Sequence, residues 1–463
     1  MGGGLLQLVA YGAQDVYLTG NPQITFFKVV YRRHTNFAME AIEQTFSGNP
    51  NYGNTVYCQI SRNGDLIHRT YLEVGIKGLT DTTNNSYVNY LGLRLLKQVS
   101  IEIGGQQIDK HYSDWLYIWN ELSLPHGKRF AWDTMVGADS DALNSAAFST
   151  NDDTTTYLYI PLEFWFCRNI GLSLPLIALQ YHEVKIKIDF ETFANCTFRT
   201  TTPFANGATG ETTATSLQNP KLWVDYIYLD TDERRKFAQL SHEYLIEQLQ
   251  FTGTETLNTS GSRVKLNFNH PCKELIWVPK IHTPVSQWYN YTFTSALITD
   301  NSNAYISFKL PDIDTTATTT YAGSSNLPLS SAITSATLNN AIIDNILPYN
   351  DSILTSFNNP FTNCLLQLNG NDRFNVRNGS YFNLVQPYQH HTNIPRNRGI
   401  NVYSFALKPE EHQPSGTLNM SRIDTAILDL KVLTGVSGSV NIYAVNYNVL
   451  RILSGMGGLA YSN

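Results

Sequence analysis

The chain has 463 residues and a formal net charge of −6. This acidic balance argues against a dedicated nucleic-acid binder, which usually carries excess basic charge. Charged residues make up 15% of the chain, against an average of about 25%. The chain is instead rich in Tyr, Phe, Thr, Val and Ile, which suit pleated, half-buried surfaces. The composition predicts an all-β protein, long enough for two large domains with substantial cores.

The cysteines predict neither a disulfide framework nor a zinc ribbon, because they are odd in number, far apart and include no CxxC pair. We expect reduced thiols, with Cys58 and Cys167 in strand-like runs as small buried hydrophobes. The start of the chain has no basic region before its short apolar stretch, so no secretory signal is predicted. No apolar run approaches the roughly 18 residues that span a bilayer. We therefore expect a soluble protein made in the cytosol.

Short segments that alternate apolar and polar residues recur along the chain and predict strands. In the first half they are Thr55–Ile60, Leu66–Val74, Lys97–Ile103, Glu183–Phe190 and Val224–Leu229. In the second half they are Val264–Phe268, Leu275–Val278, Ala304–Leu310, Leu365–Leu368, Val402–Leu407, Ala426–Val432 and Val440–Val445. Many short strands divided by turn residues are typical of sandwiches and barrels.

Helices are predicted at only three places, which are Tyr87–Leu96, Asp114–Leu122 and Asp232–Leu249. The last lies near the middle of the chain and is interpreted as a linker between domains. Residues 137–156, 200–219 and 301–340 are rich in Ser, Thr, Asn and Gly and are predicted to be surface loops. The third is long enough to decorate an outer face.

The two halves resemble each other in three segments that occur in the same order. Residues 101–106 match 366–371, residues 184–188 match 428–432, and residues 224–228 match 440–443. This order favours duplication of one β unit. A jelly roll has about eight strands, and two copies fit the length. We predict two tandem eight-stranded jelly rolls, with residues 1–24 as an N-terminal arm, 25–232 as the first roll, 233–248 as a linker helix, 249–452 as the second roll and 453–463 as a tail.

No catalytic, cofactor-binding or metal site is predicted. His182-Glu183 and His242-Glu243 lack the second His that a metalloprotease helix places four residues after the first, and a P-loop and a GxSxG elbow are both missing. Asp230, Asp232 and Glu233 are interpreted as helix-start charges rather than a glycosidase pair.

Two polar motifs in the second half are interpreted as surface or subunit contacts. His390-His391 is adjacent in sequence, so a shared metal would need a loop and distant partners. Arg396 and Arg398 follow Tyr388 in a Pro- and Asn-rich segment. Such a segment favours a protein contact over nucleic-acid binding.

Three stretches carry a resemblance to a known family. Residues 15–22 (DVYLTGNP) with 26–37 (FFKVVYRRHTNF) are similar to its N-terminal signature, 161–167 (PLEFWFC) with 174–179 (LPLIAL) to its central one, and 403–409 (YSFALKP) with 413–422 (QPSGTLNMSR) to its C-terminal one. The family is that of the major capsid proteins of nucleocytoplasmic large DNA viruses, with phycodnavirus, iridovirus and marseillevirus members as neighbours and the marseillevirus group as the expected nearest. The structural signature positions are Asp15, Gly20, Asn21, Pro22, Phe26, Phe27, Arg32, Phe37, Pro161, Phe164, Pro175, Leu179, Pro409, Gln413, Pro414, Ser415, Gly416, Asn419, Ser421 and Arg422.

This resemblance implies a double jelly roll that forms homotrimers, which act as pseudo-hexagonal capsomers and tile the icosahedral shell of a large double-stranded DNA virus. It implies no enzyme activity and no cofactor. The implied partners are copies of the chain, neighbouring capsomers, minor capsid and penton proteins, and a host-surface glycan or receptor, with no direct genome binding. The implied location is the virion, after synthesis and assembly in the host cytoplasm. The residues alone leave open a carbohydrate-binding sandwich and a glycosidase.

Overall fold

The computed structural model describes residues 3–10, 12–79, 85–138, 155–199, 202–206, 216–281, 288–292 and 359–461. The chain divides into two units, Met1–Phe37 and Ala38–Asn463. The first unit contains two short helices, α1 (Gly3–Val9) and α2 (Val16–Thr19), followed by extended chain. From residue 17 to residue 37 every described side chain is exposed. We call this unit the N-terminal arm.

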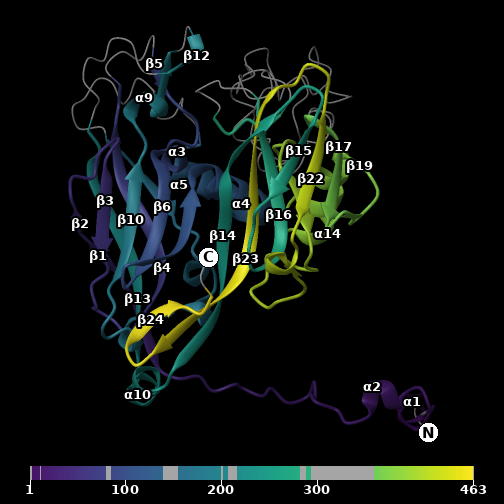
Figure 1. Ribbon diagram of the computed structural model, residues 1–463. Helices are drawn as coiled ribbons and strands as arrows, with labels where there is room; N and C mark the ends of the chain where they lie inside the picture. Colours follow the sequence, from purple (N-terminus) through teal and green to yellow (C-terminus); the bar gives the residue numbers. More distant parts are fainter. Residues whose placement is uncertain are drawn as a thin grey trace, which may run out of the picture. The chain divides into compact units, whose positions relative to one another are not determined.

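The first half of the larger unit is built from two sheets (Figure 1). One sheet has the order β1–β13–β4–β8 and the other β3–β10–β6–β7, with β9 (Leu174–Pro175) and β2 (Phe46–Ser47) at their margins. The eight main strands are β1 (Phe37–Gln44), β3 (Thr55–Gln59), β4 (Leu66–Lys77), β6 (Leu96–Ile103), β7 (Gln106–Tyr112), β8 (Thr155–Pro161), β10 (Val184–Phe190) and β13 (Gln218–Leu229). A small sheet adds β5 (Asn85–Tyr87), β11 (Thr197–Arg199) and β12 (Thr202–Asn206).

The second half repeats this arrangement. One sheet has the order β14–β23–β16–β20 and the other β15–β22–β17–β18. The eight main strands are β14 (His242–Leu257), β15 (Ser262–Leu266), β16 (Pro271–Lys280), β17 (Phe361–Leu368), β18 (Asn371–Asp372), β20 (Asn401–Ser404), β22 (Ala426–Val432) and β23 (Gly438–Leu453). Short strands β19 (Arg377–Asn378), β21 (Leu418–Asn419) and β24 (Met456–Leu459) pair at the margins.

Both halves have the same strand order when their main strands are counted along the chain. In each half, one sheet runs first, eighth, third, sixth, and the other runs second, seventh, fourth, fifth. This is the connectivity of a jelly roll, in which two Greek keys wrap into one sandwich. The three repeats seen in the sequence fall on the fourth, seventh and eighth strands of each roll. Two tandem jelly rolls are therefore confirmed.

The hairpin between the fourth and fifth strands shows how closely the rolls match. In the first roll Ile103 pairs with Gln106, and Gly104 and Gly105 between them have φ of 60° and 82°. In the second roll Leu368 pairs with Asn371 across Asn369 and Gly370, with φ of 49° and 78°. Two positive φ angles define the type I′ turn, which fits the twist of antiparallel strands and selects Gly or Asn.

Each roll closes around its own core because its strands alternate buried and exposed residues. In β10 the four residues Val184, Ile186, Ile188 and Phe190 are buried while those between them are not. The first-roll core gathers such residues from both sheets. The second-roll core is formed in the same way around Trp277 and Leu428. Alternation of this kind is what a sandwich requires.

Short helices occupy the connections between strands. They are α3 (Leu91–Leu95), α4 (Ser113–Ser123), η1 (His126–Lys128), α5 (Arg129–Val136), α8 (Trp165–Arg168), η2 (Ile170–Leu172), η3 (Leu176–Ala178), α9 (Phe193–Cys196), α10 (Thr231–Gln239), η5 (Tyr381–Val385), α14 (Gln386–His390) and η6 (Met420–Arg422). The prediction for Asp114–Leu122 is confirmed by α4. No helix within the described ranges is both long and apolar enough to cross a bilayer.

Two helix predictions are wrong in extent. The helix expected over Tyr87–Leu96 covers only Leu91–Leu95, because Tyr87 is the last residue of strand β5 and Leu96 is the first residue of strand β6. The linker helix expected over Asp232–Leu249, or 233–248, ends at Gln239, and β14 begins at His242. Pairing of β14 with β23 from His242 to Leu257 outweighs the helical spacing of its apolar residues. The predicted strand Ala304–Leu310 and most of the three predicted loops lie outside the described residues.

Candidate functional site

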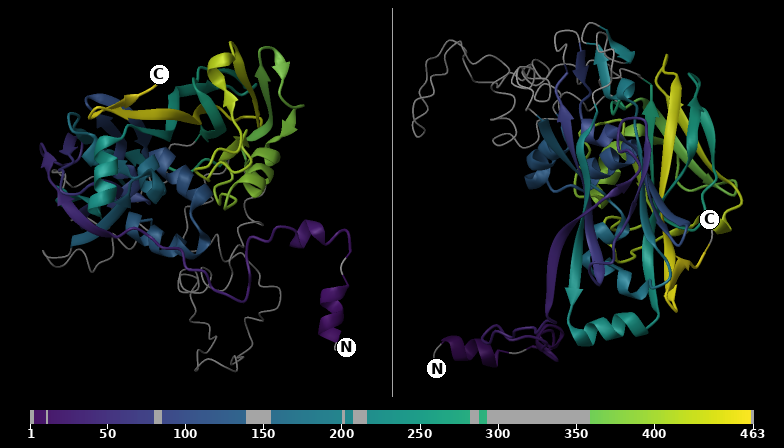
Figure 2. Two further views of the ribbon diagram at one scale, coloured as in Figure 1. Left: turned by 90° about the horizontal axis from the view of Figure 1, so that it is seen from below. Right: turned by 90° about the vertical axis from the view of Figure 1, so that its left-hand side faces the viewer.

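The two rolls meet along the sheet β14–β23–β16–β20 of the second roll, and this sheet is covered on both faces (Figure 2). On β16, Leu275 and Trp277 belong to the second-roll core, whereas Ile276 and Val278 belong to the first-roll core. Tyr112 of the first roll packs against Phe251 of the second, with the two ring centroids 5.2 Å apart. Continuous apolar packing across the boundary means that the rolls are held together as one body.

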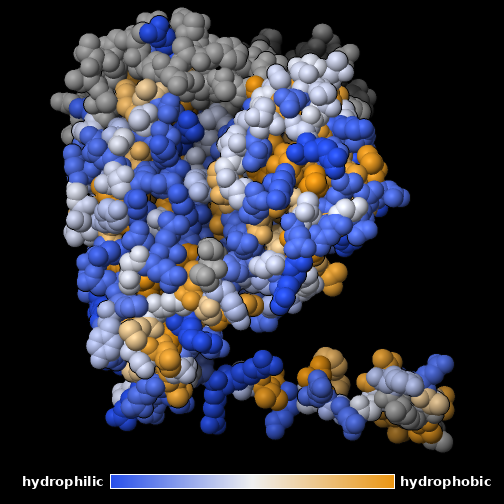
Figure 3. All heavy atoms as spheres, viewed as in Figure 1, coloured by the Kyte–Doolittle hydropathy of each residue, from blue (hydrophilic) through white to orange (hydrophobic). Residues whose placement is uncertain are grey.

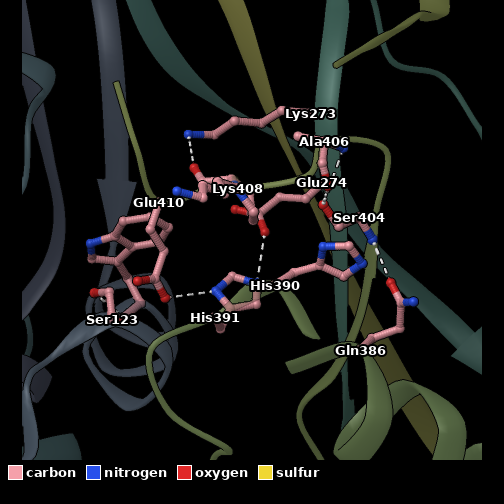
Figure 4. Close-up of polar contacts among 12 residues, drawn as sticks. Ser123, Lys273, Glu274, Gln386, His390, His391, Ser404, Ala406, Lys408 and Glu410 are labelled. Atoms are coloured by element: carbon pink, nitrogen blue, oxygen red, sulfur yellow. Dashed lines mark hydrogen bonds and ion pairs between the residues drawn. The ribbon is translucent and has the colours of Figure 1, made fainter. Parts of the chain in front are cut away.

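A cluster of charges is buried at this boundary, and we call it the charged junction. It consists of Arg168 from the first roll and Glu247, Lys273, Glu274, His391 and Glu410 from the second. Figure 4 shows how Lys273, Glu274, His391 and Glu410 lie. Arg168 Nη1 lies 2.9 Å from Glu247 Oε2, and Lys273 Nζ lies 2.7 Å from Glu247 Oε1. The Glu247 carboxylate therefore joins a cation of each roll.

The aromatic ring of Trp119, on α4 of the first roll, completes the setting of these cations. The Arg168 guanidinium lies 4.1 Å from the ring centroid and Lys273 Nζ lies 5.9 Å from it. Lys273 is fully buried and also donates to the carbonyl oxygen of Pro409. A cation over an aromatic face is stabilised more strongly when both are shielded from water, so burial favours this arrangement.

His391 bridges two carboxylates inside the junction. Its Nε2 lies 3.0 Å from Glu274 Oε2 and its Nδ1 lies 2.9 Å from Glu410 Oε1, and the His391 and Glu274 side chains have no exposed surface. Burial alone lowers the pKa of His391, but Glu274 and Glu410 outweigh burial and raise the pKa to about 9. Burial raises the pKa of Glu274, and its cationic neighbours, His391 first, outweigh this and lower it. With His391 protonated, three cations face three anions.

A second cluster links the rolls around Glu121 of α4. Arg129 forms an ion pair with Glu121, and Arg396 of the second roll donates its backbone N–H to Glu121 Oε2 at 3.1 Å. Burial raises the pKa of Glu121, but Arg129 and Arg396 outweigh it and hold the pKa near 2. Arg396 Nη2 also lies 3.7 Å from Asp133. Arg396 therefore contacts Glu121 and Asp133 of its own chain.

A third link joins α4 to the end of β16. Lys280 Nζ lies 2.6 Å from Asp114 Oδ1, and the Tyr291 hydroxyl donates to the same oxygen at 2.7 Å. Burial lowers the pKa of Lys280 and outweighs the opposing effect of Asp114. Helix α4 thus contributes to all three of these links, through Asp114, Trp119 and Glu121.

Several predicted polar positions take a place different from the expected one. The sequence predicts His390 and His391 at a surface or a subunit contact, but the His391 side chain is buried in the charged junction. His390 is half-buried, and its Nδ1 lies 3.0 Å from the Leu407 carbonyl oxygen. His242 lies on a strand rather than in a helix. Cys167 lies in helix α8 rather than in a strand. All five cysteines are free thiols. The described residues contain no metal-binding group of three His, Cys, Asp or Glu.

The signature positions lie in three separate places. Those from Asp15 to Phe37 belong to the N-terminal arm, where Phe26 and Phe27 are 88% and 97% exposed. The central positions are part of the first roll, where the buried ring of Phe164 stacks on His111 at 4.9 Å. The C-terminal positions surround the loop after β20, and Pro409 there accepts the hydrogen bond from Lys273.

The charged junction itself was not predicted. One signal was available, because Lys273 and Glu274 interrupt an otherwise apolar run from Cys272 to Val278. Charged residues are almost never fully buried unless they are paired, so a charged pair within a buried strand predicts partners elsewhere. Sequence alone does not show which residues those partners are.

Comparison with known proteins agrees with this architecture. Residues 25–230 match the family "Major capsid protein N-terminus", and residues 233–458 match "Large eukaryotic DNA virus major capsid protein". The major capsid protein of Pyramimonas orientalis virus is 48% identical over 486 residues, covering 100% of both chains. The chain belongs to the major capsid proteins of large eukaryotic DNA viruses. Members of this family are structural proteins and not enzymes. This capsid protein forms the icosahedral capsid of a large DNA virus. Its location is the capsid shell of the virion.

A further relative and a solved structure, both of one algal virus, are also similar to this capsid protein. The major capsid protein of Paramecium bursaria Chlorella virus 1 is 42% identical over 491 residues, covering 100% of both chains. The solved structure "PBCV-1 virus capsid, quasi-atomic model" covers 95% of this chain and 100% of its own, with a TM-score of 0.70 and 38% identity. These similarities favour the phycodnavirus members. The expected nearness to the marseillevirus group stays a prediction.

Proposed function

We propose that three copies of this capsid protein form a pseudo-hexagonal capsomer. The observation that carries this proposal is the identical strand order of the two rolls, which gives each chain two equivalent β units. Three chains then place six similar units around one axis, and blocks of hexagonal outline can tile flat facets. Closed point-group symmetry is the usual state of homo-oligomers.

The charged junction supports this proposal by making the two rolls one rigid block. Removing one partner from a buried ion pair leaves an uncompensated charge and costs about 3–5 kcal/mol. A shift of one roll against the other that separates Arg168 of the first roll from Glu247 of the second incurs a cost of this kind. A capsomer with a fixed outline needs such a fixed angle between its rolls.

The N-terminal arm supports a role in contacts beyond one chain. Its apolar side chains are spread along it and exposed (Figure 3). Exposed apolar surface of this extent marks an interaction site. We assign these contacts to neighbouring capsomers and to minor capsid and penton proteins, with assembly in the host cytoplasm and no direct contact with the genome.

The division of the chain belongs to the same proposal. The sequence predicts residues 1–24 before a first roll over 25–232, whereas the unit that we call the N-terminal arm extends to Phe37. We take the linker to be centred on α10. The second roll then begins with β14 rather than at residue 249, and residues 453–463 close the chain with β24. The signature positions are proposed as structural ones. Binding of a host glycan or receptor stays a prediction.

The proposal is tested by electron microscopy of purified protein at high concentration. We expect particles of hexagonal outline that pack into flat arrays. Deleting residues 1–20 should leave those particles intact and impair the arrays or shells. Normal shells from the deletion variant would contradict the role of the arm, and particles without hexagonal outline would contradict the capsomer.

A further inference from the structure

The contact between the two rolls inside one chain uses a different surface from each roll. The second roll contributes the outer face of its sheet β14–β23–β16–β20, and the first roll contributes β7 and α4. Leu249 N donates to Asp109 Oδ1 at 3.1 Å, and the ring of Trp115 lies 5.7 Å from that of Tyr443. Such a heterologous contact can be repeated from one unit to the next.

The first roll has the equivalent sheet, β1–β13–β4–β8, and its outer face is open in the part of the chain that the structure describes. On β8, Leu158 and Ile160 are buried, whereas Tyr157 and Tyr159 between them are 41% and 37% exposed. Further side chains continue this row across β4, β13 and β1. We call the row the aromatic face, and its members are Met39, Tyr71, Tyr157, Tyr159 and Trp223.

The rings of the aromatic face are held in place by neighbours on the same sheet. Tyr71 and Trp223 are stacked with an angle of 16° and centroids 6.5 Å apart. Trp223 Nε1 donates to Glu73 Oε2 at 2.6 Å. Close to Trp223, Lys221 forms an ion pair with Glu43 at 3.0 Å. The Trp223 indole and the Lys221 ammonium are thus paired within the sheet, and the ring surfaces remain available for apolar contact.

The second roll carries the counterpart of the surface that the first roll uses. Helix α4 lies between the fifth and sixth strands of the first roll, and η5 with α14 lies between the fifth and sixth strands of the second. Apolar side chains reach the surface in the region of β19 and α14 (Figure 3). Val376, Val385 and Tyr388 are 56%, 39% and 77% exposed. We call these three residues the helical edge.

We propose that the aromatic face of one copy receives the helical edge of a second copy, repeating head to tail the contact that joins the two rolls within a chain. This inference rests on the proposed capsomer and names the surfaces that close it. Contacts within chains and contacts between chains then alternate around the axis, and no roll keeps an open sheet face.

The composition of the aromatic face favours a second copy over a sugar. Interface cores are enriched in Tyr, Trp and Met and are surrounded by a polar rim, which describes this face. A sugar site needs a few polar groups free to fix the ligand. The Trp223 indole and the Lys221 ammonium are instead already paired with Glu73 and Glu43.

Light scattering on three variants of the full chain tests the proposal. The first carries Tyr157→Glu with Tyr159→Glu, the second Val385→Glu with Tyr388→Glu, and the control Tyr181→Glu, at a tyrosine that is 75% exposed and outside both surfaces. We expect a trimeric control and two monomeric variants, each with the wild-type circular dichroism spectrum. A mixture of the two variants in equal amounts should give dimers, because each retains the surface that the other lacks.

Other outcomes distinguish a wrong capsomer from a wrong assignment of its surfaces. A monomeric wild-type protein would contradict the capsomer itself. A trimeric wild-type protein with trimeric variants, or a mixture that stays monomeric, would overturn the assignment of these surfaces and leave the capsomer standing. The third outcome concerns sugar binding. If β-linked glucan oligosaccharides quench the tryptophan fluorescence of the wild-type protein but not of the first variant, and this variant stays trimeric, the aromatic face is a sugar site. This result would also overturn the assignment of the surfaces.

Discussion

Replacing His391 by glutamine should remove a pH-dependent contribution to stability. The imidazolium lies between Glu274 and Glu410, and its pKa of about 9 in the folded chain stands above the ordinary value of 6.5. The difference corresponds to about 3 kcal/mol at about 1.4 kcal/mol per pH unit. Because the folded pKa is the higher one, this stability is fully present below about pH 6.5 and is lost as the pH rises through about 9.

The assay is denaturant unfolding of wild-type and His391→Gln protein between pH 6 and pH 10, followed by tryptophan fluorescence. The wild-type protein should be more stable by about 3 kcal/mol at pH 6, and this advantage should shrink toward zero near pH 10. His390→Gln is the matched control, because His390 is half-buried and has no ion pair in the described chain. An advantage that stays constant over this range would refute the reasoning.

Three further predictions concern packing, turns and thiols. Gly399→Ala should lower the free energy of unfolding by about 3 kcal/mol or more, because a Cβ at this position would overlap the Tyr291 carbonyl oxygen. The control Gly127→Ala, where the added Cβ meets no neighbour, should change it by no more than about 0.5 kcal/mol. Asn369→Val should lower the free energy of unfolding by about 1–2 kcal/mol, because a β-branched residue does not tolerate the φ of 49° at this position. Asn369→Gly should lower it less, because glycine accepts a positive φ. Equal melting temperatures of the two variants would contradict this prediction. A thiol reagent should label the four buried cysteines only after denaturation, and a reductant should leave the melting temperature unchanged because all five thiols are free.

The fold was predictable where a local pattern carries it. The alternation in Val184–Phe190 places each residue on one face of the sheet, so the strand and its buried side follow from the sequence. The Gly104-Gly105 and Asn369-Gly370 pairs likewise predict turns, since few residues accept positive φ. Because these signals recur in the same order, the duplication was visible as well.

The prediction failed where a partner distant in sequence decides the structure. Residues from His242 onward carry apolar side chains at helical spacing, yet they pair with β23, about 200 residues away. The charged junction is similar, because Arg168 meets Glu247 across 79 residues and both are ordinary charged residues when read singly. Tertiary pairing outweighs local propensity in such segments.

The central claim is that the double jelly roll assembles with copies of itself as a trimer. Light scattering of the purified protein over a wide range of concentration tests it most directly. The account predicts a stable particle with three times the mass of the 52.1 kDa chain. A particle with the mass of one chain at every concentration would contradict it.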